Sequence, residues 1–133
     1  MDVIEFGYKK MTPDLSEKQP VIQVTIFIKG KPFPAIGIVD SGADYVTIPL
    51  SVAISLGLER KELGPKRKTE CACGNGEFYS YLCEGEIEIG CHRFPIKISL
   101  VEGEGFVLIG RQGVFDHFHV HFDKNEKKGY LRR

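Results

Sequence analysis

Apolar and polar residues alternate with a period of two along much of this chain, which is the pattern of half-buried β-strands. Between residues 21 and 28 the alternation is built largely from β-branched side chains, with Ile26 and Ile28 on one face. A second apolar run covers residues 33–39 and follows a short turn around Gly30. Neighbouring strands joined by a short turn pair as a hairpin, so these two runs predict an antiparallel pair.

Further short strands, separated by turn-forming residues, are predicted over the rest of the chain. They cover residues 3–8, a hairpin from 69 to 82 with its tip at Gly74-Asn75-Gly76, then 86–89, 94–100, 106–109, and a final hairpin of 119–122 with 129–131. Many short strands without a βαβ rhythm predict an all-β fold closed into a barrel. At 133 residues the chain is expected to be one domain, residues 19–133, preceded by an N-terminal segment of residues 1–18.

Two interruptions of the alternation are typical of short helices. Pro49 fits the first turn of one helix and Gly57 lies just after its end. Its expected inward face is Leu50, Ala53 and Ile54. The second helix is predicted at residues 112–118, with Val114, Phe115 and Phe118 inward. Residues 59–68 are strongly charged and are interpreted as a surface link.

Charge and terminal patterning narrow the expected partners. The 18 basic and 18 acidic residues cancel, so no global field favours nucleic acid or membrane surfaces. The first residues lack the basic start of a signal peptide, and no apolar run reaches membrane-spanning length. We therefore expect a cytoplasmic protein that binds neither nucleic acid nor membrane.

The cysteines do not predict a metal site. Cys71, Cys73, Cys83 and Cys91 lack paired Cys-x-x-Cys spacing, and in a cytosolic chain they are expected to be reduced thiols. His119, His121 and Asp123 spell the His-x-His-x-Asp of metallo-hydrolases, which leaves a zinc hydrolase as a competing class. The structural alternative is the solvent face of a strand whose Phe118, Val120 and Phe122 point inward. We expect neither a metal nor a cofactor.

The stretch with the strongest chemical content is Asp40-Ser41-Gly42, directly after the apolar run at 33–39. A carboxylate at the end of a buried strand is costly unless hydrogen bonds or function retain it. Gly42 allows a sharp turn and close backbone approach, and Ser41 supplies a hydroxyl. The structural alternative is an Asx turn between two strands, which this tripeptide also suits.

Two motifs resemble the retropepsin-like, or retroviral-type, family of aspartic proteases. Residues 38–44 read Ile-Val-Asp-Ser-Gly-Ala-Asp, similar to that family's active-site motif, and residues 106–112 read Phe-Val-Leu-Ile-Gly-Arg-Gln, similar to its second signature. The resemblance covers roughly residues 19–123 and is closest to cellular, prokaryotic-type members with Ser in the motif. It implies a retropepsin-like barrel with a flap hairpin, one lobe per chain.

The resemblance implies an aspartic endopeptidase that acts as a homodimer on peptide or protein substrates. Two carboxylates must share one site and one proton, yet of six aspartates only Asp40 is followed by Ser-Gly. A two-fold symmetric dimer supplies the second Asp40. Viral dimers interleave their termini, and the longer termini here leave the dimerisation mode open. The alternative is a catalytically weak or inactive dimerisation or peptide-binding module of the same fold.

The resemblance also implies roles for the residues of this sequence that match the family's motifs. Asp40 is implied as catalytic, Ser41 as a hydrogen-bonding support across the dimer, and Gly42 as a carbonyl acceptor for the substrate backbone. A buried salt bridge is implied between Asp44 and Arg111. The implied substrate-binding residues are Gly42, Ala43, Asp44 and the flap tip Cys73, Gly74, Asn75, Gly76 and Glu77.

Overall fold

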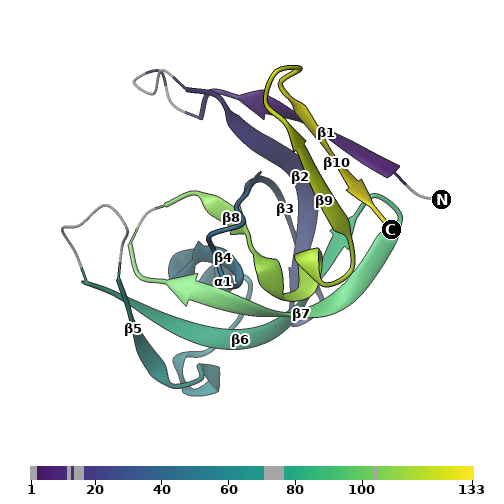
Figure 1. The fold of residues 1–133 in the computed structure, drawn as a ribbon. Helices are drawn as coiled ribbons and strands as arrows, with labels where there is room; N and C mark the ends of the chain where they lie inside the picture. Colours follow the sequence, from purple (N-terminus) through teal and green to yellow (C-terminus); the bar gives the residue numbers. More distant parts are fainter. Residues whose placement is uncertain (1–2, 12, 14–16, 71–76, 104) are drawn as a thin grey trace.

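A computed structural model of the chain describes residues 3–11, 13, 17–70, 77–103 and 105–133. Six strands form a closed hydrogen-bonded ring (Figure 1). In ring order they are β2 (Gln19–Ile28), β3 (Lys31–Val39), β8 (Val107–Ile109), β4 (Val46–Pro49), β7 (His92–Val101) and β6 (Glu77–Ile89), which pairs back with β2. The prediction of an all-β closed barrel is confirmed.

Four more strands extend the ring at two places. On β2 the sheet continues through β1 (Val3–Lys9), β10 (Lys128–Arg132) and β9 (His119–Asp123), and on β6 it continues through β5 (Lys66–Glu70). β1 and β10 pair antiparallel from Val3 opposite Arg132 to Gly7 opposite Lys128. The strands at the two ends of the chain therefore pair with each other, and Figure 1 shows both termini on the same side of the fold.

The core lies inside the ring and is made mainly of branched aliphatic side chains. Alternation along each strand sends every second side chain inward, as the sequence pattern predicts. The fully buried ones include Ile26, Ile28, Ile48, Ile87, Ile89, Ile98, Leu100 and Ile109. Each such side chain stabilises the fold by about 1.5–3 kcal/mol, so the ring is held chiefly by this apolar filling.

The hairpin of β2 and β3 confirms the prediction for this part of the chain. Lys29 and Gly30 form its two-residue turn, with φ of 53° and 76°, and Ile28 lies opposite Lys31. Positive φ at both positions suits the right-handed twist of the flanking strands. The pairing then runs without interruption to Val21 opposite Ile38, which delivers the end of β3 to the middle of the fold.

β8 lies between β3 and β4, although these two strands are consecutive in the sequence. It pairs parallel with β3, from Gly37 opposite Val107 to Val39 opposite Ile109, and antiparallel with β4. The connection of residues 40–45 must therefore cross the end of β8. Gly37 makes room for this packing, since a Cβ there would lie 2.7 Å from Ile109 Cδ1.

The first helix matches its prediction except for one residue. α1 (Leu50–Ser55) begins after Pro49, and Gly57 follows its end with φ of 102°. Leu50 and Ala53 are buried, but Ile54 is 38% exposed, so its expected inward orientation is wrong. Val52 and Leu56, on either side of Ile54, pack against the core instead.

The predicted helix at 112–118 is wrong as a continuous element. Gln112 and Gly113 have non-helical backbones, with φ of 90° at Gly113, and the helical turn is confined to the residues after them. The N–H groups of His117 and Phe118 both donate to the Val114 carbonyl, over 3.0 and 3.1 Å. Val114 and Phe118 are buried as expected, and Phe115 is half-buried.

The hairpin predicted at 69–82 exists with a different register. A two-residue turn at Asn75-Gly76 would place Thr69 opposite Leu82, whereas Thr69 lies opposite Phe78 and Ser80 lies opposite Arg67. The register that a turn at Asn75-Gly76 implies is therefore wrong. β5 is anchored from its other end, where Gly64 N–H donates to the Leu82 carbonyl over 3.2 Å. The tip itself, residues 71–76, lies outside the described residues.

The charged stretch and the last strand also differ from expectation. The predicted surface link contains a short 3₁₀ helix, Arg60–Glu62, and the start of β5. Phe122 on β9 is 38% exposed rather than inward, although its ring meets Phe6 edge-on at 5.9 Å. Within the described part of the chain, β9 is the edge strand of the sheet, so only one side of it packs beside another strand.

Candidate active site

Asp40 lies directly after β3, where the connection to β4 crosses β8. Its N–H continues the ladder by donating to the Ile109 carbonyl over 3.0 Å. Gly42 N–H donates to Asp40 Oδ1 over 2.8 Å, and Ala43 N–H donates to the Asp40 carbonyl over 3.3 Å. This is the local geometry of an Asx turn, and it fixes the carboxylate by one oxygen. Among the described residues no hydrogen bond reaches Oδ2, which leaves that oxygen for other chemistry.

The two residues after Asp40 are presented to solvent. Ser41 and Gly42 are exposed, whereas Asp40 and Ala43 are half-buried. No hydrogen bond of the Ser41 hydroxyl occurs within the part of the chain that the structure describes. The carboxylate is thus held by its own chain, whereas the hydroxyl beside it has no hydrogen-bond partner among the described residues.

The connection is locked onto the segment after β8 by a second set of backbone hydrogen bonds. Arg111 N–H donates to the Ala43 carbonyl over 2.9 Å, and Gln112 N–H donates to the Asp44 carbonyl over 2.8 Å. Gly110 is wedged against the same loop, because a Cβ there would lie 2.3 Å from the Tyr45 oxygen and 2.8 Å from the Ala43 oxygen. The two sequence motifs therefore form one backbone network.

Arg111 also pairs with Asp44 through its side chain. Arg111 Nη2 donates to Asp44 Oδ1 in an ion pair within the chain. The two side chains are 55% and 65% exposed, so the expected burial of this pair is wrong for the single chain. Because solvent screens an exposed pair, it contributes little to stability by itself.

A cation–aromatic contact joins the same loop to β5. The Arg67 guanidinium carbon lies 5.2 Å from the centre of the Tyr45 ring. The sequence offered only a weak sign of this contact, an aromatic residue directly after the second aspartate of the motif. Arg67 itself fell in the stretch interpreted as a solvated link, so the contact was missed.

Most of the residues expected to form the flap lie outside the described part of the chain. Cys73, Gly74, Asn75 and Gly76 lie outside the described residues, and Glu77 is placed only as the first residue of β6. The backbone pairing of β5 with β6 extends to Glu70 opposite Glu77. A hairpin thus leads toward the expected tip, and the role of the tip remains a prediction.

The three histidines of residues 117–121 lie in separate surroundings. His117 stacks on Phe94 with ring centres 4.2 Å apart, and its Nδ1 lies in hydrogen-bonding range of the Gly113 carbonyl. His119 and His121 are exposed on β9, opposite Arg132 and Tyr130. The described residues contain no cluster of three metal-ligating side chains.

Two of the cysteines can be placed. Cys83 is buried and Cys91 is exposed, and both are free thiols. Burial raises the pKa of the Cys83 thiol to about 11, with a smaller contribution from the charge of Glu84. Cys71 and Cys73 lie outside the described residues.

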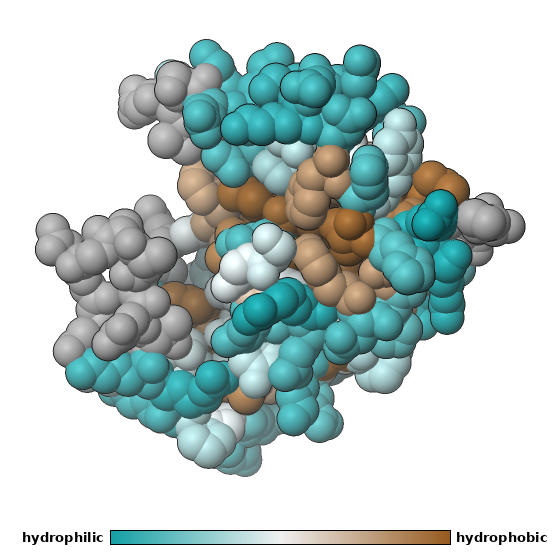
Figure 2. All heavy atoms as spheres, in the orientation of Figure 1, coloured by the Kyte–Doolittle hydropathy of each residue, from teal (hydrophilic) through white to brown (hydrophobic). Residues whose placement is uncertain are grey.

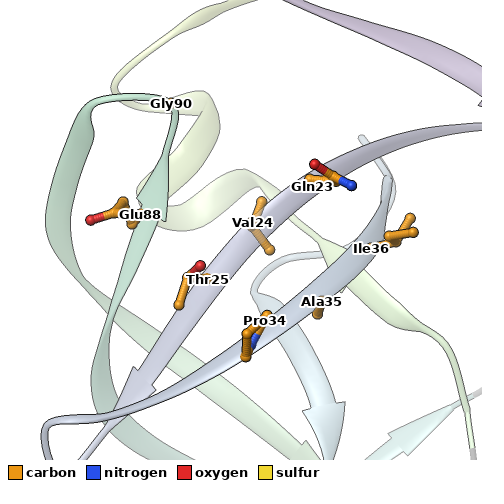
Figure 3. Close-up of a pocket in the computed structure, with 8 residues that line it drawn as sticks. All are labelled: Gln23, Val24, Thr25, Pro34, Ala35, Ile36, Glu88 and Gly90. Carbon is orange, nitrogen blue, oxygen red and sulfur yellow. The ribbon is translucent and has the colours of Figure 1, made fainter.

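Two hollows on the described surface of the chain have linings that do not include Asp40. One, of about 480 Å³, lies over β2 and β3 beside the end of β6, where Gln23, Thr25, Ile36 and Glu88 line it (Figure 3). Another, of about 580 Å³, lies near Gly113 and His117. Figure 2 shows apolar atoms gathered in the middle of one face, around the position where Figure 1 labels β2, β3, β8 and β9.

The comparisons with known proteins bear on the fold. No family model matches the sequence, and no curated protein sequence matches it. A retropepsin-like aspartic protease from Rickettsia conorii has a similar structure, with a TM-score of 0.67 and 18% identity over 98% of this chain and 91% of that one. EIAV protease complexed with the inhibitor HBY-793 aligns with a TM-score of 0.47 and 19% identity, over 76% of this chain and 88% of that one.

Within the described residues, no helix is both long and apolar enough to cross a membrane. The ring of strands, the crossing of β8 between β3 and β4, and the likeness to the Rickettsia structure agree with one another. The chain has the retropepsin-like fold.

Proposed function

We propose that this protein is an aspartic endopeptidase that acts as a homodimer, with one Asp40 from each copy. The observation that carries the proposal is the setting of Asp40. Its backbone is fixed to Ile109, one carboxylate oxygen is fixed by Gly42, and the other oxygen accepts no hydrogen bond from the described residues. A carboxylate held this firmly on a solvent-facing loop is suited to activating a water molecule.

The chemistry follows from two such carboxylates in contact. Like charges at that distance share one proton. The ionised Asp40 takes a proton from water, which attacks the carbonyl carbon of the peptide. The protonated Asp40 polarises the carbonyl oxygen and then protonates the leaving amine as the C–N bond breaks, while the pair keeps the proton taken from water. No metal or cofactor takes part.

The dimer is required because the chain carries one motif. A two-fold axis beside Asp40 brings the two carboxylates together. Ser41, exposed and without a hydrogen-bond partner in the described chain, is assigned to a bond with the backbone of the other copy. β1 and β10 already pair with each other within one chain, so we assign the dimer contact to the loop of residues 40–44 rather than to exchanged terminal strands.

The substrate is assigned to the face of the sheet that leads to Asp40. Ile36, Ile38 and Asp40 alternate along β3 and so share one side. Phe106 directly precedes Val107, which pairs with Gly37, and the side chains of Phe106 and Ile36 are 41% and 39% exposed. Backbone contacts to the peptide are assigned to Gly42, Ala43 and Asp44, and closure over it to the flap residues Cys73, Gly74, Asn75, Gly76 and Glu77.

The test is hydrolysis of a diverse peptide library from acid to neutral pH by the wild type and by Asp40→Asn. The substitution keeps size and hydrogen bonding but removes the shared proton, so cleavage should be abolished while the dimer and peptide binding persist. Asp116→Asn is the matched control, since Asp116 is exposed and outside the motif, and it should cleave as the wild type does. A folded wild-type dimer that cleaves nothing would instead support the peptide-binding module.

A further inference from the structure

We infer that Arg67 selects substrates with an acidic side chain flanking the scissile bond, an inference that rests on the proposed peptide site. The first observation is the face of the β5–β6 hairpin on which Arg67 lies. Arg67 lies on β5, opposite Ser80, and Ser80 is 1% exposed. Arg67 and Ser80 therefore share the inward face of this hairpin, whereas the neighbouring Lys66 lies on the outward face, over the ring of Tyr79.

The second observation is the distance from Arg67 to the catalytic loop. The Arg67 guanidinium lies over the Tyr45 ring. Tyr45 is two residues past Ala43, so their Cα atoms are at most about 7 Å apart. Ala43 in turn donates its N–H to the Asp40 carbonyl. The cation thus lies where β5 contacts the segment that follows the Asp40 loop.

The third observation is that no carboxylate of the described residues pairs with this cation. Among the described residues, Arg67 has the Tyr45 ring as its contact and no carboxylate. The carboxylate nearest in sequence to that ring, Asp44, is already paired with Arg111. A guanidinium lying over an aromatic ring keeps N–H donors at its edge, and these match a carboxylate in two parallel hydrogen bonds. An acidic peptide side chain is the ligand that this arrangement lacks.

The experiment uses a peptide library in which each position flanking the cleavable core carries Glu, Gln or Lys. For the wild type, kcat/KM should be about fivefold higher for Glu than for Gln at a flanking position, the size expected for a partly exposed charge pair. The Glu/Gln ratio should fall to about one in Arg67→Gln and below one in Arg67→Glu. Lys66→Gln, which removes an adjacent cation from the opposite face, should keep the wild-type ratio.

A binding measurement separates this inference from the proposed function. Fluorescence anisotropy with labelled Glu and Gln peptides and the Asp40→Asn protein reports selection without turnover. A Glu preference in binding that is lost on Arg67→Gln supports the inference even if the wild type cleaves nothing, which would overturn only the proposed endopeptidase. Cleavage or binding with a Glu/Gln ratio near one, a ratio unchanged by Arg67→Gln, or no binding of acidic peptides overturns the inference.

Discussion

The backbone N–H of Asp40 donates to the carbonyl of Ile109 over 3.0 Å, which joins the two most distinctive stretches of the sequence. Ile109 is fully buried at the end of β8, so the hydrogen bond ties the proposed catalytic loop to the rigid centre of the barrel. Catalytic groups act best when their supports do not move. The position of Asp40 is therefore set by strand topology as well as by its own turn.

Gly110→Ala should destabilise the fold by about 3 kcal/mol, because its new Cβ would lie 2.3 Å from the Tyr45 oxygen. The steric clash is with backbone atoms, so it cannot be relieved by a change of side-chain rotamer. The φ of −95° at Gly110 is accessible to alanine, so the cost is steric. Urea unfolding measures the loss.

Gly7→Ala is the control for that experiment. Gly7 lies in β1 with no atom within 4 Å of an added Cβ, so alanine there should be neutral or slightly stabilising. If both variants unfold like the wild type, the close crossing of Gly110 over the loop does not exist in solution.

The Asp44–Arg111 pair should contribute at most about 1 kcal/mol, since both side chains are more than half exposed in the chain. A double-mutant cycle with Asp44→Asn and Arg111→Gln isolates the coupling, and raising the salt concentration should reduce it. A coupling of several kcal/mol that resists salt would contradict this prediction and would place the pair in a buried interface of the assembled protein.

The Cys83 thiol should make stability fall as the solution becomes strongly alkaline. Burial raises its pKa from 9.0 to about 11, so between these values the unfolded chain has lost a proton that the folded chain retains. The contribution is fully present below pH 9 and is lost as the pH rises through about 11. The decline should be shallower in Cys83→Val and unchanged in Cys91→Ser, as measured by urea unfolding over this pH range.

Thiol labelling of the same variants gives an independent check. At mildly alkaline pH the exposed Cys91 should react quickly in the native protein, and Cys83 should react only after unfolding. Rapid labelling of Cys83 in the native state would mean that the strand β6 opens at this position.

The parts of the fold that could be predicted from sequence are those set by neighbouring residues. Alternation in β2, an apolar run in β3 and the two-residue turn between them predict this hairpin, and the Asp40 turn is determined by the residues that follow it. β5 was missed because its charged side chains are those of a solvated link, yet charges are also usual on a strand at the end of a sheet.

Other features depended on contacts between distant parts of the chain. The helix predicted at 112–118 is cut short because the backbones of Arg111 and Gln112 bind the Ala43 and Asp44 carbonyls. The register of the β5–β6 hairpin is accompanied at its base by a hydrogen bond between Gly64 and Leu82, which no local pattern near residue 69 indicates. The Arg67–Tyr45 contact arises only once the hairpin lies over the loop. No local pattern carries such information.

In the proposed enzyme, each active site uses one Asp40 from each of two copies. The direct test is to dissociate wild-type and Asp40→Asn proteins, mix them at constant total concentration, let them reassociate, and measure peptide hydrolysis. Random pairing makes activity follow the square of the wild-type fraction, so an equal mixture should retain about one quarter of the activity. Retention of about one half, in proportion to the wild-type fraction, would show that one copy suffices and would contradict the account.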